Sequence, residues 1–148
     1  MAESTKKKIV HIHLGTDNFK TVMTAGQHEL ISDEPKNIGG SDEGPDPYDY
    51  LMMSLGSCTV ITIRMYAERK GWDFKNIYME LRHQKDYAED CKDCDDPKAK
   101  IDVIEKEIII EGDLSDDQLE RLLEISKKCP VHKTMQGDLE LKSTIERK

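Results

Sequence analysis

Aromatic residues and long hydrophobic runs are both scarce in this sequence. Aromatic residues make up 5% of the 148 residues, so a core must be built mainly from Ile, Leu, Val and the 7 methionines. The longest uncharged stretch, residues 50–63, is shorter than the ~20 residues that cross a bilayer. We therefore expect a soluble protein in which residues 1–148 form a single domain.

The sequence also has no excess of positive charge. It contains 30 acidic residues against 22 Lys and Arg residues, which gives a net charge of −8. Such a charge repels nucleic acids and anionic membranes, so we expect neither as a partner. The N-terminal residues do not resemble a signal peptide, and we expect a cytoplasmic protein. In that compartment the 4 cysteines should be reduced unless they are catalytic or bind metal.

Alternating and β-branched residues predict three strands at the N-terminal end. A turn at Gly26 separates the second strand from the third, and we expect an antiparallel meander. Residues 33–47 have no apolar period and predict a long loop, which is often a functional feature. The predicted strands are residues 7–14, 19–25 and 27–32.

Asp46 and Pro47 form a favourable start for a helix that Gly71 should end. The helix is apolar on every side for several turns, which is typical of a helix buried all round. A chain of 148 residues has little material to cover such a helix, so a second copy could complete the cover. Its apolar and small residues are Leu51, Met52, Met53, Leu55, Cys58, Val60, Ile61, Thr62, Ile63 and Met65.

The remaining sequence predicts two more strands, two helices and a final strand. Residues 76–85 and 101–111 alternate in the manner of half-buried strands. A capping box at Ser115 opens one helix, and Pro130 opens a shorter one. The final strand is predicted at residues 139–145. Because no regular β–α–β alternation appears, the fold class is α+β with a mainly antiparallel sheet.

Cys129 has surroundings that favour a thiolate. It directly precedes Pro130 and therefore lies at a helix start, where unpaired backbone N–H groups lower a thiol pKa. His132 falls on the same side of the first helical turn. A buried, inert cysteine at a helix junction is the alternative. The basic residues that flank it are Lys127, Lys128 and Lys133.

Cys58 lies on the apolar stripe of the long helix. In that setting a thiol packs as a small hydrophobic group, and burial raises its pKa. Gly56 and Ser57 make the helix surface shallow beside it, which leaves room for another backbone or a substrate. Nothing in the local sequence brings Cys58 to Cys129.

Other possible ligands of metals have simpler interpretations. Cys91 and Cys94 have the spacing of a metal or dithiol site, but their acidic neighbours disfavour thiolates, so we expect exposed, unpaired thiols. A disulfide, an auxiliary redox pair or a metal site stays open for them. His11 and His13 are typical of an exposed strand edge, and His83 of a satisfied core histidine. We expect no metal and no other cofactor.

Four motifs in the chain resemble those of one known family. They occur in the family's order and together extend over nearly the whole chain. On these residues the chain is similar to the OsmC/Ohr family, and most similar to its OsmC-like branch. The motifs are GGSDEGPDPYDYL at residues 39–51, LGSCT at 55–59, EGDL at 111–114 and KCPVHKT at 128–134.

The resemblance implies a fold, an assembly and a reaction. Family members are intertwined homodimers with a strongly bent antiparallel sheet, two central helices and active sites at the subunit interface. The cysteine that matches Cys58 attacks an organic hydroperoxide and becomes a sulfenic acid. The cysteine that matches Cys129 then forms a disulfide with it, which a dithiol reductant opens. We therefore expect Cys58 and Cys129 to be catalytic, with His132 in support.

The chain departs from the family at the residues that activate the thiol. Well-characterised members use an N-terminal arginine, held by a glutamate directly after the loop proline. Here Tyr48 and Asp49 follow that proline, and no arginine precedes Arg64. Lys20, Lys36 and Arg64 are the candidate substitutes. Asp49 is a candidate supporting residue, although its charge opposes a thiolate.

Two functional hypotheses follow from these residues. The first is a thiol-dependent peroxidase that acts on organic hydroperoxides and oxidises Cys58 in each cycle. The second is a non-catalytic OsmC-like module that binds a small apolar ligand at the subunit interface, which the missing arginine and glutamate favour. The second hypothesis requires a bound ligand and no thiol oxidation.

Overall fold

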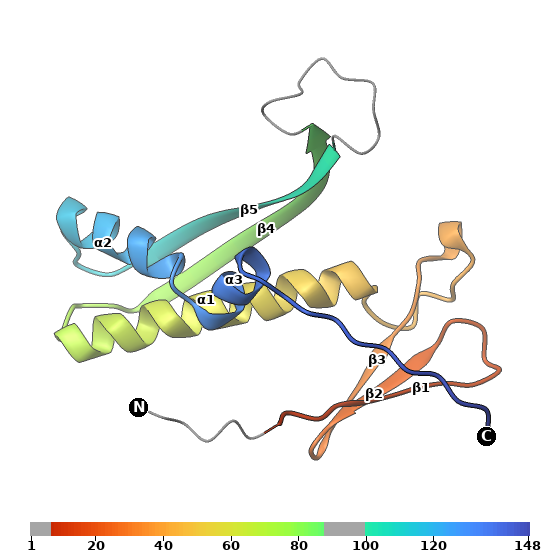
Figure 1. Cartoon of the computed structure of the whole chain (residues 1–148). Helices are drawn as coiled ribbons and strands as arrows, with labels where there is room; N and C mark the ends of the chain where they lie inside the picture. The colour runs from red at the N-terminus through yellow and green to blue at the C-terminus, as the bar shows by residue number, and fades with distance from the viewer. Residues whose placement is uncertain (1–6, 88–99) are drawn as a thin grey trace. The chain divides into compact units, whose positions relative to one another are not determined.

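The structure of this protein is a computed structural model that describes residues 7–87 and 100–148 (Figure 1). Its contacts divide the chain into two units, one that ends at Leu51 and one that begins at Met52. Each unit is described by itself. The expectation that residues 1–148 form a single domain stays a prediction.

Three strands form an antiparallel meander in the first unit (Figure 1). β1 (His11–Leu14), β2 (Thr21–Ala25) and β3 (His28–Ser32) are hydrogen-bonded in the order β1-β2-β3. Gly26 makes the turn between β2 and β3 with a φ of 60°, a left-handed conformation that favours glycine. The predicted meander is confirmed, with β1 shorter than the predicted residues 7–14.

Hydrogen bonds to a buried carboxylate stabilise the loop after β3. Asp33 accepts hydrogen bonds from the backbone N–H groups of Glu34 at 2.7 Å and Glu43 at 3.1 Å. Gly40 leaves no room for a side chain, because a Cβ there would collide with the Glu34 carbonyl oxygen. A short 3-10 helix, η1 (Lys36–Ile38), interrupts the loop. The predicted loop therefore has a defined backbone.

α1 (Pro47–Lys70) begins and ends at the residues that the sequence predicts. Asp46 and Asp49 exchange hydrogen bonds at its start, since each carboxylate accepts from the other residue's backbone N–H, at 2.9 Å and 3.0 Å. This reciprocal cap satisfies N–H groups that a helix start leaves unpaired. At the other end, Gly71 adopts a φ of 68° and ends the helix.

α1 is buried on one face and exposed on the other. Met53, Ile61 and Met65 lie on the exposed face, although all three are large and apolar. Within one chain, the helix that the sequence predicts to be buried all round is therefore covered on one side. The buried face carries Leu55, Gly56, Thr59, Ile63, Tyr66 and Ala67.

β4 (Asn76–Tyr87) and β5 (Lys100–Glu111) form a two-stranded antiparallel sheet that packs on α1 (Figure 1). Gly56 permits a close approach, because a Cβ there would lie 2.9 Å from Cδ1 of Leu81 on β4. The register pairs Leu81 with Lys106 on β5. Both predicted strands are confirmed, and Leu81 fills the shallow helix surface beside Gly56.

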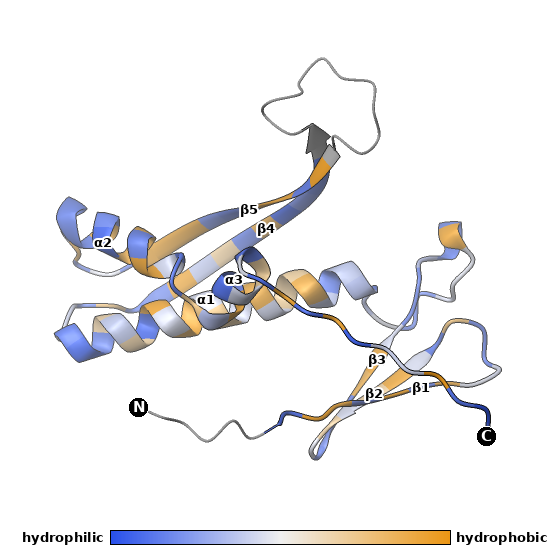
Figure 2. Ribbon diagram, in the orientation of Figure 1, coloured by the Kyte–Doolittle hydropathy of each residue, from blue (hydrophilic) through white to orange (hydrophobic). Residues whose placement is uncertain are grey.

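Two short helices follow β5. α2 (Asp116–Ser126) starts with the predicted capping box, in which Ser115 and Gln118 each accept from the other's backbone N–H. α3 (Pro130–Gln136) begins at Pro130, as predicted, and Cys129 is its N-cap residue. Figure 2 shows that the hydrophobic part of β5 runs beside α2. The core of this unit is formed by Ile63, Tyr66, Ala67, Leu122 and Ile125.

The predicted final strand at residues 139–145 is wrong. Residues 138–148 form neither helix nor strand. Their apolar side chains are exposed, with Leu139, Leu141 and Ile145 at 60%, 82% and 100%. A period of two produces a strand only where a sheet edge is available for pairing, and none of the described strands pairs with this segment.

Leu122→Ala is expected to lower the free energy of unfolding by about 2–5 kcal/mol, because truncation of a core leucine leaves a cavity. Leu122 is 1% exposed, whereas Leu123 on the same helix is 54% exposed. Leu123→Ala is therefore the matched control and should lower the free energy by less than about 1 kcal/mol. Urea unfolding followed by circular dichroism measures both, and equal losses would contradict the placement of the core.

Candidate functional site

The structure brings the two predicted cysteines into contact. Cys58 lies on α1 and is half-buried, whereas Cys129 lies at the start of α3 and is fully buried. Both are free thiols, and the Cys58 side chain makes a hydrogen bond with Cys129. Both belong to the unit that begins at Met52. Tertiary packing thus creates a dithiol that the local sequence does not specify.

Polar groups of α1 and α3 surround the Cys129 sulfur. The backbone N–H of His132 donates to Cys129 Sγ at 3.3 Å, as expected for an N-cap residue. The hydroxyl oxygen of Thr59 lies 3.4 Å from the same sulfur. Thr59 follows Cys58 on α1 and is fully buried. The Cys129 sulfur is therefore held by groups from two helices.

A lysine that the sequence patterns did not single out completes the cluster. Lys106 projects from β5, and its Nζ lies 2.8 Å from His132 Nδ1 and 3.1 Å from Thr59 Oγ1. Its third contact is the carbonyl oxygen of Ser126, at 3.2 Å. An ammonium group has three hydrogens, and these three acceptors use all of them. The charge of Lys106 is therefore held in one position.

Cys129 and Lys106 influence each other's protonation. Burial raises the pKa of the Cys129 thiol, but hydrogen bonds from Thr59, the His132 N–H and Cys58, together with the Lys106 charge, hold that pKa below its ordinary value. Burial lowers the pKa of Lys106, while negative charge on Cys129 and Cys58 acts in the opposite direction. A thiolate on Cys129 and an ammonium on Lys106 therefore stabilise each other.

His132 has two contacts in this cluster, and its supporting role at the thiols stays a prediction. Its imidazole contacts Lys106, and because an ammonium only donates, Nδ1 accepts and the ring proton lies on Nε2. Burial and the Lys106 charge lower the pKa of His132, and a hydrogen bond with Gln136 opposes them. The imidazole is therefore a neutral acceptor. The backbone N–H of His132, rather than its ring, acts on Cys129.

The other residues considered for thiolate activation have different surroundings. Arg64 forms an ion pair with Glu68 on the same helix, at 2.9 Å. Lys20 and Lys36 belong to the first unit, as does Asp49, whose carboxylate caps α1. A supporting role for Asp49 at the thiols stays a prediction.

One feature of the sequence could have identified Lys106. On β5 the half-buried face carries Ile104, Ile108 and Ile110, and Lys106 occupies the position between the first two. A lysine within an apolar period of two predicts a buried charge that needs partners. Its partners come from α1, α2 and α3, and no local pattern identifies them.

The histidines singled out on β1 and β4 agree with the sequence predictions in part. His83 is half-buried on β4, and its Nε2 lies 2.8 Å from Oδ1 of Asp102, so the imidazole has a hydrogen-bond partner but lies outside the buried core. His11 and His13 are exposed on β1, which is an edge strand of its sheet.

Cys91 and Cys94 lie outside the described residues. Among the side chains at residues 7–87 and 100–148, no group of three or more His, Cys, Asp and Glu is placed to hold a metal ion. In the same part of the chain, no helix has the length and apolar character that crossing a membrane requires.

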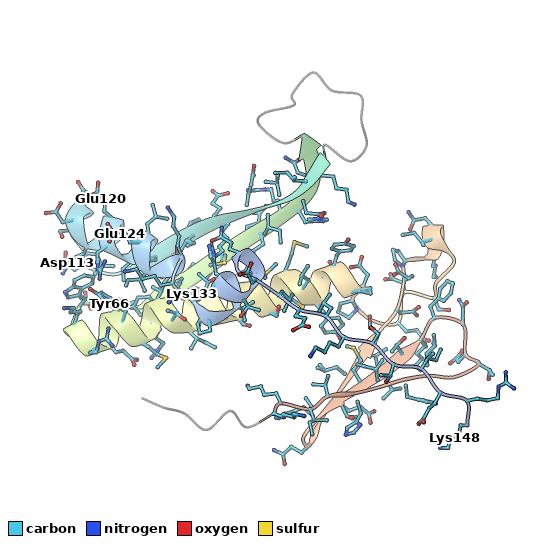
Figure 3. All side chains as sticks on the ribbon, in the orientation of Figure 1. Tyr66, Asp113, Glu120, Glu124, Lys133 and Lys148 are labelled. Carbon is cyan, nitrogen blue, oxygen red and sulfur yellow. The ribbon has the colours of Figure 1, made fainter. Side chains whose placement is uncertain are left out.

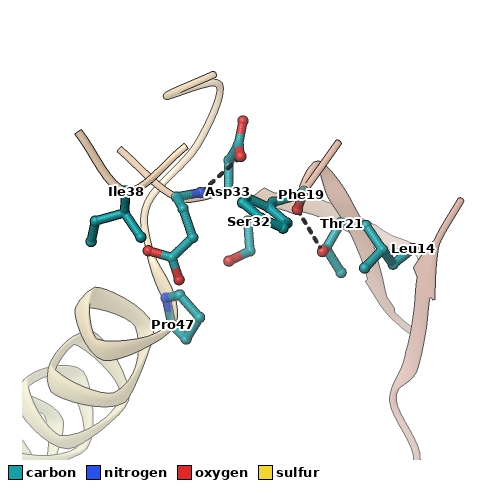
Figure 4. Close-up of a pocket in the computed structure, with 8 residues that line it drawn as sticks. Leu14, Phe19, Thr21, Ser32, Asp33, Ile38 and Pro47 are labelled. Carbon is teal, nitrogen blue, oxygen red and sulfur yellow. Dashed lines mark hydrogen bonds between the residues drawn. The ribbon is translucent and has the colours of Figure 1, made fainter. Parts of the chain in front are cut away.

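A cavity of about 200 Å³ opens beside Lys106 and His132. Apolar side chains from α1, β5 and α3 form much of its wall, which gives the cluster a partly apolar opening. A separate cavity of about 370 Å³ lies within the first unit, where Figure 4 shows Asp33 and Phe19 among the residues that line it. The apolar wall of the smaller cavity contains Leu55, Ile104 and Met135.

Comparison with known proteins places the sequence in a family. The family model described as OsmC-like protein matches residues 40–144 of the chain. An uncharacterized protein of Haloferax volcanii is 27% identical over 131 residues, which cover 87% of this chain and 88% of that protein.

Solved structures of low sequence identity share the fold. The OsmC like protein of Mycoplasma pneumoniae has a TM-score of 0.71 at 21% identity, with 90% of both chains covered. An organic hydroperoxide resistance protein OsmC of Legionella pneumophila has a TM-score of 0.66 at 18% identity, with 91% of this chain and 93% of that chain covered. The predicted α+β fold of the OsmC type is confirmed. Because the family model matches more than half of the chain, this protein belongs to the OsmC-like family.

Proposed function

We propose that this protein reduces organic hydroperoxides with the thiols of Cys58 and Cys129. The proposal rests on one observation, the contact between a half-buried thiol on α1 and a fully buried thiol with a lowered pKa. Reactive cysteines lie in surroundings that lower the thiol pKa. Membership of the OsmC-like family supports the proposal, and one structural relative is an organic hydroperoxide resistance protein.

Accessibility supports the order of roles for the two cysteines. Cys58 has exposed surface and can meet a peroxide, whereas Cys129 has none. The thiol that a bulky hydroperoxide reaches first is therefore Cys58. Cys129 is suited to the second step, because its thiolate form is stabilised and already lies against Cys58.

The proposed cycle has one two-electron oxidation, one condensation that releases water and one two-electron reduction. The Cys58 thiolate attacks the outer peroxide oxygen, the O–O bond breaks, and the alkoxide takes up a proton to become an alcohol. The Cys129 thiolate then attacks the sulfur of the Cys58 sulfenic acid, and hydroxide leaves with a proton as water. A cytoplasmic dithiol supplies the two electrons that reopen the disulfide.

The alternative function is a non-catalytic module that binds a small apolar ligand. The absence of any arginine before Arg64 and of a glutamate directly after Pro47 favours it. Lys106 weakens the argument from the missing arginine, because it supplies a positive charge at Cys129 from a different element of the fold. The redox proposal is therefore the better supported of the two.

We also propose that two copies of this chain assemble through α1. Met53, Ile61 and Met65 are large apolar side chains on the exposed face of that helix. An exposed apolar surface of this kind marks an interaction site. A second copy is the occupant that the family resemblance implies, and it would cover the uncovered side of α1.

One equivalent of cumene hydroperoxide is expected to lower the intact mass of the reduced protein by about two mass units, which corresponds to a disulfide. Every protein in this test also carries Cys91→Ser and Cys94→Ser, so that these two thiols do not contribute. Cys58→Ser should leave the mass unchanged, because the peroxide-reactive thiol is removed. Cys129→Ser should stop at a Cys58 sulfenic acid, which a dimedone adduct reports.

The same variants separate the two functional hypotheses. An unchanged mass in the protein that retains Cys58 and Cys129, together with an apolar molecule in the native mass spectrum, would support the binding module. A mass loss that persists after Cys58→Ser would overturn the assigned order of roles.

Ile61→Lys is expected to convert the dimer into a monomer, because it places an unpaired charge in the proposed apolar contact. Glu120→Lys introduces the same side chain at an exposed charged position of α2 (Figure 3) and should leave the dimer intact. Sedimentation velocity measures the mass of each protein. A monomeric parent protein, or equal effects of the two substitutions, would rule out this assembly.

A further inference from the structure

Lys106 places a half-buried charge on the apolar face of β5. Its neighbours on that face are Ile104 and Ile108. A charge in such a position is unfavourable unless its partners compensate for the loss of water. Every hydrogen bond of its ammonium goes to the group around Cys129, which points to a role in the chemistry of that thiol. The acceptors are Thr59, Ser126 and His132.

We propose that Lys106, acting through Thr59, sets the direction of thiol–disulfide exchange at the Cys58–Cys129 pair. It stabilises the Cys129 sulfur as the thiolate that leaves when the disulfide is reduced, so the reductant attacks Cys58. Lys106 is thus a positioning residue. The direction of exchange rests on the proposed function, because it requires the disulfide, whereas the effect of Lys106 on the Cys129 thiol rests on geometry alone.

The hydrogen bonds of Lys106 exclude a role as a ligand anchor. All three hydrogens of its ammonium are donated to protein acceptors, which leaves none for a substrate. Its path to Cys129 runs through Thr59 Oγ1, which lies 3.1 Å from Lys106 Nζ and 3.4 Å from Cys129 Sγ. The lysine therefore acts as a fixed charge behind a hydroxyl group.

Thr59 can transmit this charge because its hydroxyl has alternative acceptors. The oxygen accepts from Lys106, which makes the hydroxyl a stronger donor. Its hydrogen can point to the Leu55 carbonyl oxygen at 2.8 Å or to Cys129 Sγ at 3.4 Å. When Cys129 ionises, rotation of the hydroxyl supplies a hydrogen bond to the thiolate. Ionisation of Cys129 is thereby coupled to Lys106.

The better leaving sulfur decides how a dithiol opens a disulfide. A sulfur with a lower thiol pKa leaves faster, and the sulfur under attack must be accessible. Both conditions select Cys58 as the site of attack and Cys129 as the leaving group. The first reductant thiolate forms a mixed disulfide on Cys58 and releases the Cys129 thiolate. The second thiolate of the same reductant then attacks the reductant sulfur that is bound to Cys58. This step releases the Cys58 thiolate and forms the disulfide of the reductant, so that two electrons have passed to the protein.

Titratable groups face Cys129 from three packed elements. α1 contributes Cys58, β5 contributes Lys106, and α3 contributes His132. His132 is a neutral acceptor from Lys106, and Cys58 can be replaced by serine. Among the described residues, Lys106 is then the positive charge that acts on the thiol. In a protein with serine at position 58, a change in the Cys129 pKa on replacement of Lys106 therefore measures the effect of the Lys106 charge.

The pH dependence of the thiolate absorbance of Cys129 tests the charge effect in a protein whose other cysteines are replaced by serine. Lys106→Met is expected to raise the Cys129 pKa by about one unit or more, because it removes the opposite charge. Lys106→Arg should restore most of that difference. Lys133→Met removes an exposed lysine of α3 (Figure 3) and should leave the pKa unchanged.

Thr59→Val tests the same path without changing Lys106. Valine has the shape of threonine but no hydroxyl, so this variant should also raise the Cys129 pKa. Because the Thr59 hydrogen bond itself lowers the Cys129 pKa, this variant tests the path and not the charge. If Lys106→Met does not fold, which circular dichroism detects, Lys106→Gln provides the decisive result, because it removes the charge and keeps a polar side chain. A Cys129 pKa that stays unchanged in the folded variants overturns the inference, whether or not peroxide oxidises the protein.

The site of reductant attack is measured on the mixed disulfide. Diamide oxidises the protein that carries Cys91→Ser and Cys94→Ser, so that the disulfide forms without peroxide. 2-Mercaptoethanol then attacks the Cys58–Cys129 disulfide, and acid stops the reaction. Peptic digestion and mass spectrometry identify the cysteine that carries the adduct. We expect the adduct on Cys58, and several-fold slower reduction after Lys106→Met. An adduct on Cys129, or no disulfide, overturns the inference. A Cys58 adduct in a protein that does not react with hydroperoxide supports it and rejects the peroxidase function.

Discussion

The half-buried ammonium of Lys106 is the interaction on which the rest of the site depends. From β5 it contacts three acceptors, which are Thr59 on α1, Ser126 at the end of α2 and His132 on α3. A single charge therefore fixes how four elements meet around Cys129. Because a charge that is partly removed from water is unfavourable without partners, the three acceptors favour this arrangement of the elements. The constraint that orders the packing also stabilises the thiolate.

α1 connects this site to the surface of the protein. Its buried face carries Thr59 and part of the core, and its opposite face carries exposed apolar side chains such as Ile61 and Met65. At 100° per residue, Cys58 lies at the border between the two faces, which accounts for its half-buried thiol. In the proposed assembly, the second copy that covers the exposed face would also border Cys58. The proposed assembly and the access of a peroxide to the thiol would then be coupled through one helix.

Local sequence patterns predict the elements of the fold because their causes are local. The caps at Asp46 and Ser115 specify two helix starts, and the structure confirms both. The contact of the two cysteines is reached only through the family resemblance, since it depends on packing between distant segments. The same reason explains why the partners of Lys106 are not predicted, although its position in the apolar period of β5 is visible in the sequence, and why the predicted strand at residues 139–145 is wrong. Partners across the fold decide both cases, and a single sequence does not encode those partners in its spacing.

The most direct measurement of the central claim is a peptide map of unreduced protein after one equivalent of an organic hydroperoxide. The account predicts a cross-linked pair of peptides that contains Cys58 and Cys129. A cross-link confined to Cys91 and Cys94, or a Cys58 thiol that survives the treatment unmodified, would contradict it.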